Sequence, residues 1–177
     1  MKRNGFFVQL CIVISILINT TSCASVSTAH QDPSIPWQEH AFLLPSANDR
    51  GSVSVWGFYK PDKDGSAAFR TINTNVVGLI PPGTQTINVR VSALEYEESR
   101  AFPMTYEFLP GQRYVIAVVK ARKGLLTGTF IAEIHTVDEY RAIFAEIYPN
   151  DDGSDFKRRV LDPFEKAEAE LSKKYTQ

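Results

Sequence analysis

The sequence Pro81-Pro82-Gly83 places the strongest local constraint on how this chain can fold. Proline fixes the backbone dihedral φ and has no amide hydrogen, so no central β-strand can run through the two prolines. Glycine can adopt the positive φ that a type II turn requires at its third position. An apolar run, 76–80, precedes the turn, and Ile87, Val89 and Val91 alternate with polar residues after it. This pattern predicts two strands joined by a turn, the second strand having one exposed face.

Similar strand signals recur through the middle of the chain. Strands are predicted at 52–59, 67–73, 104–108, 114–119 and 129–135, with turn-forming residues between most of them. Together with the two strands beside the prolines, this makes about seven strands at regular spacing. Because no long helical pattern interrupts them, we expect an antiparallel β-sandwich over residues 51–136 rather than a parallel α/β sheet.

The hydrophobic period changes after residue 136. Asp138 is placed to cap a short helix over 139–147, and Ser154 is placed to cap a second helix. Asp162-Pro163 has the order of an N-cap and a first-turn proline, so we expect a kink or a restart there. One apolar stripe follows the helical spacing of three and four, through Phe156, Val160, Phe164, Ala167, Leu171 and Tyr175. One or two C-terminal helices are therefore predicted in 137–177.

Length and charge exclude some classes of protein. A chain of 177 residues with 44% hydrophobic residues suits one globular domain with its own core. The formal net charge is −1, whereas binding to nucleic acid requires a basic surface. We therefore expect no nucleic-acid partner.

The first residues have the organisation of an export signal. Lys2 and Arg3 supply positive charge, and the mainly apolar run 6–18 follows them. This run is short for a transmembrane helix and has the length of a signal-peptide core. Small residues come next and end at Cys23, with Ala24 after it. The pattern predicts a secreted or membrane-attached protein.

This leader resembles that of bacterial lipoproteins, in which the mature chain begins at a lipid-carrying cysteine. The resemblance implies a signal peptide over 1–22, lipidation of Cys23, and a lipid-anchored tether and edge segment over 23–50. Ala24 resembles the residue found with outer-membrane sorting, which implies a periplasm-facing position on that membrane. Cleavage after Ala24, giving a soluble secreted protein, and an uncleaved anchor remain alternatives. The one other cysteine, Cys11, lies in the leader, so no disulfide is expected in the mature chain.

The strand region also resembles a loose group of small bacterial envelope lipoproteins of uncharacterised function. These have a transthyretin-like or immunoglobulin-like β-sandwich. The shared pattern combines an early aromatic strand, a Val-Gly pair and two Pro-Gly turns that each lead into an apolar strand. In this chain the corresponding residues are Ser52–Tyr59, Val77-Gly78, Pro82-Gly83 with Ile87-Asn88-Val89, and Pro110-Gly111 with Tyr114-Val115-Ile116. The group implies a fold and a location, and no activity.

Two pairs of residues are candidates for a functional site. Glu133 and His135 share one face of a predicted strand, so they could bind a metal ion or act as acid and base. A solvated face at the end of a strand is the commoner arrangement of such a pair. Trp56 and Phe58 share a strand face and could form an exposed patch for a partner, although core positions are the commoner use of such residues.

The sequence therefore predicts a non-catalytic interaction or accessory module. We expect it to be anchored to the membrane through Cys23, to contact another envelope protein, and to need no cofactor. The alternatives are a binder of a small ligand or metal, and an envelope enzyme that uses Glu133 and His135.

Overall fold

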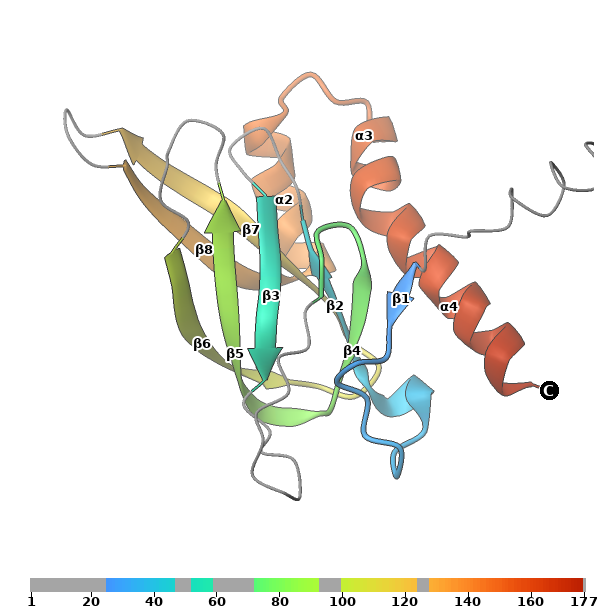
Figure 1. Ribbon diagram of the computed structural model, residues 1–177. Helices are drawn as coiled ribbons and strands as arrows, with labels where there is room; N and C mark the ends of the chain where they lie inside the picture. The colour runs from blue at the N-terminus through green and yellow to red at the C-terminus, as the bar shows by residue number, and fades with distance from the viewer. Residues whose placement is uncertain (1–24, 47–51, 59–71, 93–99, 124–127, 177) are drawn as a thin grey trace, which may run out of the picture.

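The computed structural model describes residues 25–46, 52–58, 72–92, 100–123 and 128–176 (Figure 1). Within these ranges the chain forms two β-sheets followed by helices, which confirms the prediction of a strand-rich chain with C-terminal helices. The five-stranded sheet contains, in spatial order, β1 (Val26–Ser27), β4 (Val77–Ile80), β2 (Ala41–Pro45), β7 (Arg113–Lys123) and β8 (Gly128–Thr136). The three-stranded sheet contains β3 (Ser52–Phe58), β5 (Gly83–Ser92) and β6 (Arg100–Phe108).

The larger sheet is mixed, so the expectation of purely antiparallel strands is wrong. Strand β1 runs parallel to β4, and β2 runs parallel to β7. An edge segment was expected within 23–50, but β2, which belongs to that range, lies in the centre of the sheet. Its Leu43 pairs with Gly78 of β4 on one side and with Tyr114 of β7 on the other. Proline near this run suggested an edge strand. Pro45, however, is the last residue of β2, where its missing amide hydrogen does little harm.

Both faces of this larger sheet are covered. In β2, Phe42 and Leu44 belong to an apolar cluster shared with the helices, whereas Ala41 and Leu43 belong to a second cluster shared with the three-stranded sheet. All four are at most 3% exposed. A strand with both faces buried needs a continuous apolar run rather than an alternating one, which is what 41–44 provides. The helices, the larger sheet and the smaller sheet therefore form successive layers.

The Pro81-Pro82-Gly83 turn joins the two sheets. Sequence alone suggested that its flanking strands belong to one sheet, but β4 and β5 lie in different ones. The positive φ expected of Gly83 is confirmed at 96°. The alternation after the turn is also confirmed, because Ile87 and Val89 are fully buried while Asn88 between them is partly exposed.

Helix α2 (Val137–Ile147) begins directly after β8. Its N-cap is Thr136 rather than the predicted Asp138. The Thr136 hydroxyl accepts a hydrogen bond from the Glu139 amide at 3.3 Å, and the Glu139 carboxylate accepts one from the Thr136 amide at 2.8 Å. This reciprocal capping box satisfies two amides that a helix start would otherwise leave unpaired.

The last helical segment is continuous through Pro163. It consists of α3 (Ser154–Phe156), the π-helical turn η2 (Lys157–Leu161) and α4 (Asp162–Tyr175). Ser154 and Asp162 were predicted to be N-caps, and both predictions are wrong. The N-cap of α3 is Gly153, and the backbone at Asp162 is itself helical. The Asp162 amide bonds to the Lys157 carbonyl, and this wider turn comes just before the proline, which cannot make the usual helical bond.

The predicted apolar stripe of this segment is buried along most of its length. Phe156, Val160, Phe164, Ala167 and Leu171 are at most 3% exposed and pack on the larger sheet's cluster. The stripe ends there, because Tyr175 is 48% exposed, contrary to its predicted core position.

Several predictions fall outside the described residues. These are the leader over 1–22, Cys23, and the strand over 67–73 except for its end, where Ile72 bridges to Val55. Among the described helices, none has both the length and the apolar character needed to cross a membrane.

Gly78 is a test of how tightly the sheet centre is packed. A Cβ atom on this residue would lie 2.1 Å from Cδ1 and 3.0 Å from Cγ1 of the fully buried Ile72. We predict that Gly78→Ala lowers the free energy of unfolding by about 1–3 kcal/mol, the range seen for overpacked cores, in urea titrations. Ile72→Val removes Cδ1, so in that background the same change should cost less. Equal costs in both backgrounds would refute the contact.

Candidate functional site: a groove between residues 31–38 and helix α4

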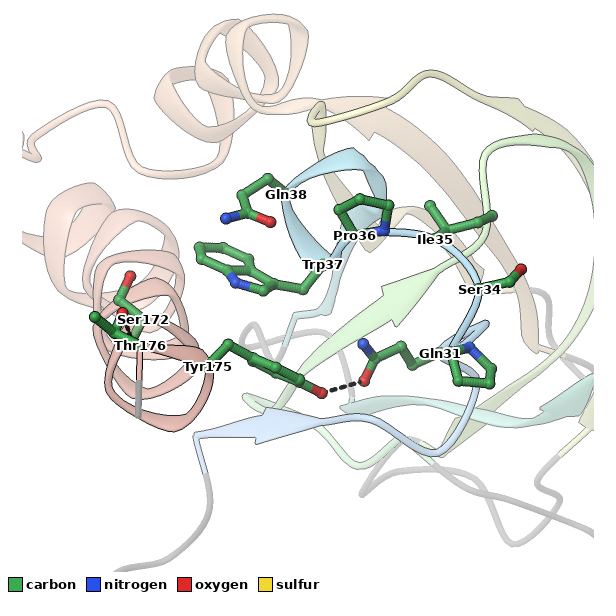
Figure 2. Close-up of a pocket in the computed structure, with 10 residues that line it drawn as sticks. Gln31, Ser34, Ile35, Pro36, Trp37, Gln38, Ser172, Tyr175 and Thr176 are labelled. Carbon is green, nitrogen blue, oxygen red and sulfur yellow. Dashed lines mark hydrogen bonds between the residues drawn. The ribbon is translucent and has the colours of Figure 1, made fainter.

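A groove of about 490 Å³ lies between the segment 31–38 and the last turn of α4 (Figure 2). Trp37 points from the short 3₁₀ helix η1 (Trp37–Glu39) toward α4, and Tyr175 points from α4 toward Gln31. The volume of the groove falls in the range of about 300–1,000 Å³ that is usual for ligand pockets. The two walls are more than 130 residues apart in sequence, so the groove exists only in the folded chain.

The first wall is held by His40, which is fully buried. Its Nε2 atom lies 3.0 Å from the Asp32 amide nitrogen, and its Nδ1 atom lies 3.0 Å from the Pro36 carbonyl oxygen. An amide can only donate, so Nε2 must accept and Nδ1 must carry the hydrogen that is donated to Pro36. One neutral tautomer of His40 therefore clamps both ends of the segment 32–36.

Other contacts complete this wall. The Asp32 carboxylate accepts hydrogen bonds from the Ser34 amide at 2.9 Å and from its hydroxyl at 2.7 Å, which closes a tight turn. The Trp37 ring packs edge-on against Phe42 of β2, with ring centroids 6.2 Å apart. The groove wall is thus attached directly to the central strand of the larger sheet.

Helix α4 forms the second wall and is attached to the N-terminal part of the described chain at two places. The Glu170 carboxylate accepts hydrogen bonds from the amide of Ser25, at 3.1 Å, and from its hydroxyl. One turn later, the Tyr175 hydroxyl donates to the Gln31 side-chain oxygen at 2.9 Å. On the sheet side, Arg113 at the start of β7 contacts the Glu168 carboxylate at 2.6 Å. These contacts fix the position of α4 relative to the first wall.

The chemical character of the groove favours binding over catalysis. Its described lining residues carry no charged side chain, and the largest are the aromatic residues Trp37 and Tyr175. Prolines, glutamines and small hydroxyl residues make up most of the remainder. Such a surface offers apolar contact and hydrogen bonds, and it lacks the carboxylate, imidazole or thiol that general acid–base or nucleophilic chemistry uses most often.

The predicted pair Glu133 and His135 does come together. The His135 Nε2 atom lies 3.0 Å from the Glu133 carboxylate, although the two are not aligned as a hydrogen bond. The side chain of His135 is 18% exposed, and that of Glu133 is 48% exposed. The nearby capping box lowers the pKa of Glu139, mainly through the hydrogen bonds from Thr136 and to a smaller extent through the charge of His135. Among the described residues, no group of three or more His, Cys, Asp or Glu side chains is placed to hold a metal ion.

The other predicted site residues are only partly described. Cys23 lies before the first described residue, and the side chains of Trp56 and Phe58 lie outside the described part of the structure. The backbone of β3 has an irregular register between Val55 and Gly57, after which Phe58 pairs with Ile87.

Sequence reasoning missed the groove because its parts carry no joint signal. Trp37 stands in a proline-rich stretch whose pattern predicts an edge segment, and Tyr175 has the spacing of a core residue. His40 did offer one clue, because it directly precedes the buried strand β2, where a polar side chain needs hydrogen-bond partners.

Comparisons of this chain with protein-family models, with curated proteins and with solved structures found no match.

The clamp at His40 gives a direct prediction. His40→Ala removes both ring contacts and leaves the Asp32 amide without its acceptor, so we expect the free energy of unfolding to fall by about 1–3 kcal/mol. Hydrogen exchange of the Asp32 amide should become faster in the same variant. The exposed neighbour gives the control, because Glu39→Ala should change stability by no more than about 0.5 kcal/mol. Equal losses in the two variants would contradict the clamp.

Proposed function

We propose that this protein is a lipid-anchored lipoprotein of the bacterial envelope that acts as a non-catalytic interaction module. In this proposal Cys23 carries the lipid, and the groove between Trp37 and Tyr175 contacts another envelope protein. The lipid places the protein on the outer membrane, facing the periplasm, as the resemblance of the leader and of Ala24 implies.

The observation that carries the proposal is the groove itself. Two aromatic side chains face an uncharged opening. The His40 ring holds the backbone of the first wall, and the hydrogen bond from Arg113 of β7 to Glu168 holds the second. Aromatic residues in a preformed surface are typical of binding sites, because they contribute large contact areas and lose little conformational freedom on binding. A partner therefore finds its site already shaped.

The position of Ser25 supports the link between groove and membrane. Ser25 is joined to Glu170 of α4, the helix that also supplies Tyr175. Cys23 is two residues before it, and an extended chain spans at most about 3.6 Å per residue. A lipid on Cys23 would hold the domain within about 10 Å of the membrane surface, with α4 close to it. A lipoprotein attached in this way presents its groove at a fixed height.

The resemblance of the strand region to small envelope lipoproteins leads us to propose that the two sheets form a transthyretin-like or immunoglobulin-like β-sandwich. Support comes from the apolar cluster that strands of both sheets share.

The alternative function, a metal or acid–base site, has as its support the 3.0 Å contact between Glu133 and His135. That pair supplies two side chains, whereas the groove supplies a complete lined surface.

Cross-linking in intact cells tests the proposal. A photoreactive amino acid at Tyr175 should capture one envelope protein reproducibly, and the same group at Glu146, exposed on α2, should not. Helix α2 packs over β7 and β8, at the other end of the larger sheet from β1. Cys23→Ala should release the protein from the membrane fraction and reduce the capture.

The outcomes separate the two parts of the proposal. If Cys23→Ala stays in the membrane fraction, lipid anchoring at this residue is wrong. If Tyr175 and Glu146 capture the same proteins, or neither captures any, the groove is not the contact site.

A further inference from the structure

We propose that the groove binds a proline-rich segment of its partner in the extended polyproline II conformation. This rests on the proposed function as an interaction module and specifies the chemistry of what the module binds. Three features of the groove favour this ligand: its aromatic side chains, its lack of charge and the direction of its hydrogen bonds.

The aromatic side chains suit proline rings. Trp37 and Tyr175 come from opposite walls and both border the same opening (Figure 2). Aromatic-lined grooves are the usual receptors of polyproline II segments, because flat rings pack well on the ridges of this narrow helix. The segment is already extended before it binds, so little conformational entropy is lost.

The hydrogen-bonding capacity of the groove points in the same direction. Several hydroxyl groups of the lining donate their hydrogens within the protein. Tyr175 donates to Gln31, Thr176 to the Ser172 carbonyl, and Ser34 to Asp32. Other donors of the lining make no hydrogen bond among the described residues. They are the indole N–H of Trp37, the side-chain amides of Gln31 and Gln38, and the hydroxyl of Ser172.

The donors that have no partner in the protein match a ligand whose polar groups only accept. A run of prolines has backbone carbonyl oxygens and no amide hydrogens, so every one of its polar groups is an acceptor. A neutral sugar chain carries hydroxyl donors as well as acceptors, so it is the competing neutral ligand in the binding test. Acidic or basic ligands would find no opposite charge among the lining side chains.

Peptide binding to the purified protein tests the inference. The protein is purified with the N-terminus that the cell leaves on it, in detergent if it is membrane-bound. The probe is a fluorescent oligoproline of about ten residues, long enough to span the groove at about 3.1 Å per residue. Fluorescence anisotropy should show saturable binding. A glycine–serine peptide of equal length should not bind.

Three variants locate the binding. Tyr175→Ala removes one aromatic wall at an exposed position and should weaken binding about tenfold or more. Trp37→Phe keeps a ring against Phe42 but removes the indole donor, and we expect a loss of about threefold to tenfold. Leu109→Ala is the control, because Leu109 is an exposed apolar residue, 55% accessible, outside the lining. Thermal unfolding confirms that each variant is folded.

The inference is overturned if oligoproline shows no saturable binding, if Tyr175→Ala and Leu109→Ala bind alike, or if neutral chitotetraose binds at the groove in its place. Failure here leaves the interaction module standing when Tyr175 still captures a partner in cells. Release experiments with Cys23→Ala are likewise independent of the peptide result.

Discussion

The burial of β2 on both faces is the constraint from which the rest of the structure follows. This strand lies between β4 and β7, and its alternate side chains pack on the helices and on the smaller sheet. Because β2 is packed on both faces, the chain that leads into it is also held in place at the edge of the core. His40 is the residue directly before β2, and its side chain is fully buried there. The packing of the core thereby determines where the groove wall stands.

The second wall depends on the first part of the chain as much as on the helix. Helix α4 packs through its apolar stripe, and it is also joined to Ser25 through the part-buried Glu170 and to Gln31 through Tyr175. Segments near both ends of the chain therefore meet at one surface, beside α4 in Figure 1. Under the proposed function, a lipid on Cys23 would attach the chain beside the groove that we propose as the recognition surface.

Local patterns predicted the elements well and their arrangement poorly. Alternation correctly identified Ile87 and Val89 as buried, and helical spacing identified the stripe that ends at Leu171. The parallel pairing of β2 with β7 could not be predicted, because it joins segments about 70 residues apart and depends on tertiary packing. The groove was missed for a similar reason. Its two halves come from distant segments, and exposure of Tyr175 depends on where the sheet beneath α4 ends.

The most direct test of this account is the protonation pattern of the His40 ring in nitrogen-15 NMR at neutral pH. We expect a protonated Nδ1 and an unprotonated Nε2, with the Asp32 amide protected from hydrogen exchange, because these two hydrogen bonds hold the groove wall. An Nε2-protonated tautomer, or the averaged signals of a freely exposed ring, would contradict the clamp. The preformed groove, and the recognition proposed for it, would then lose their structural basis.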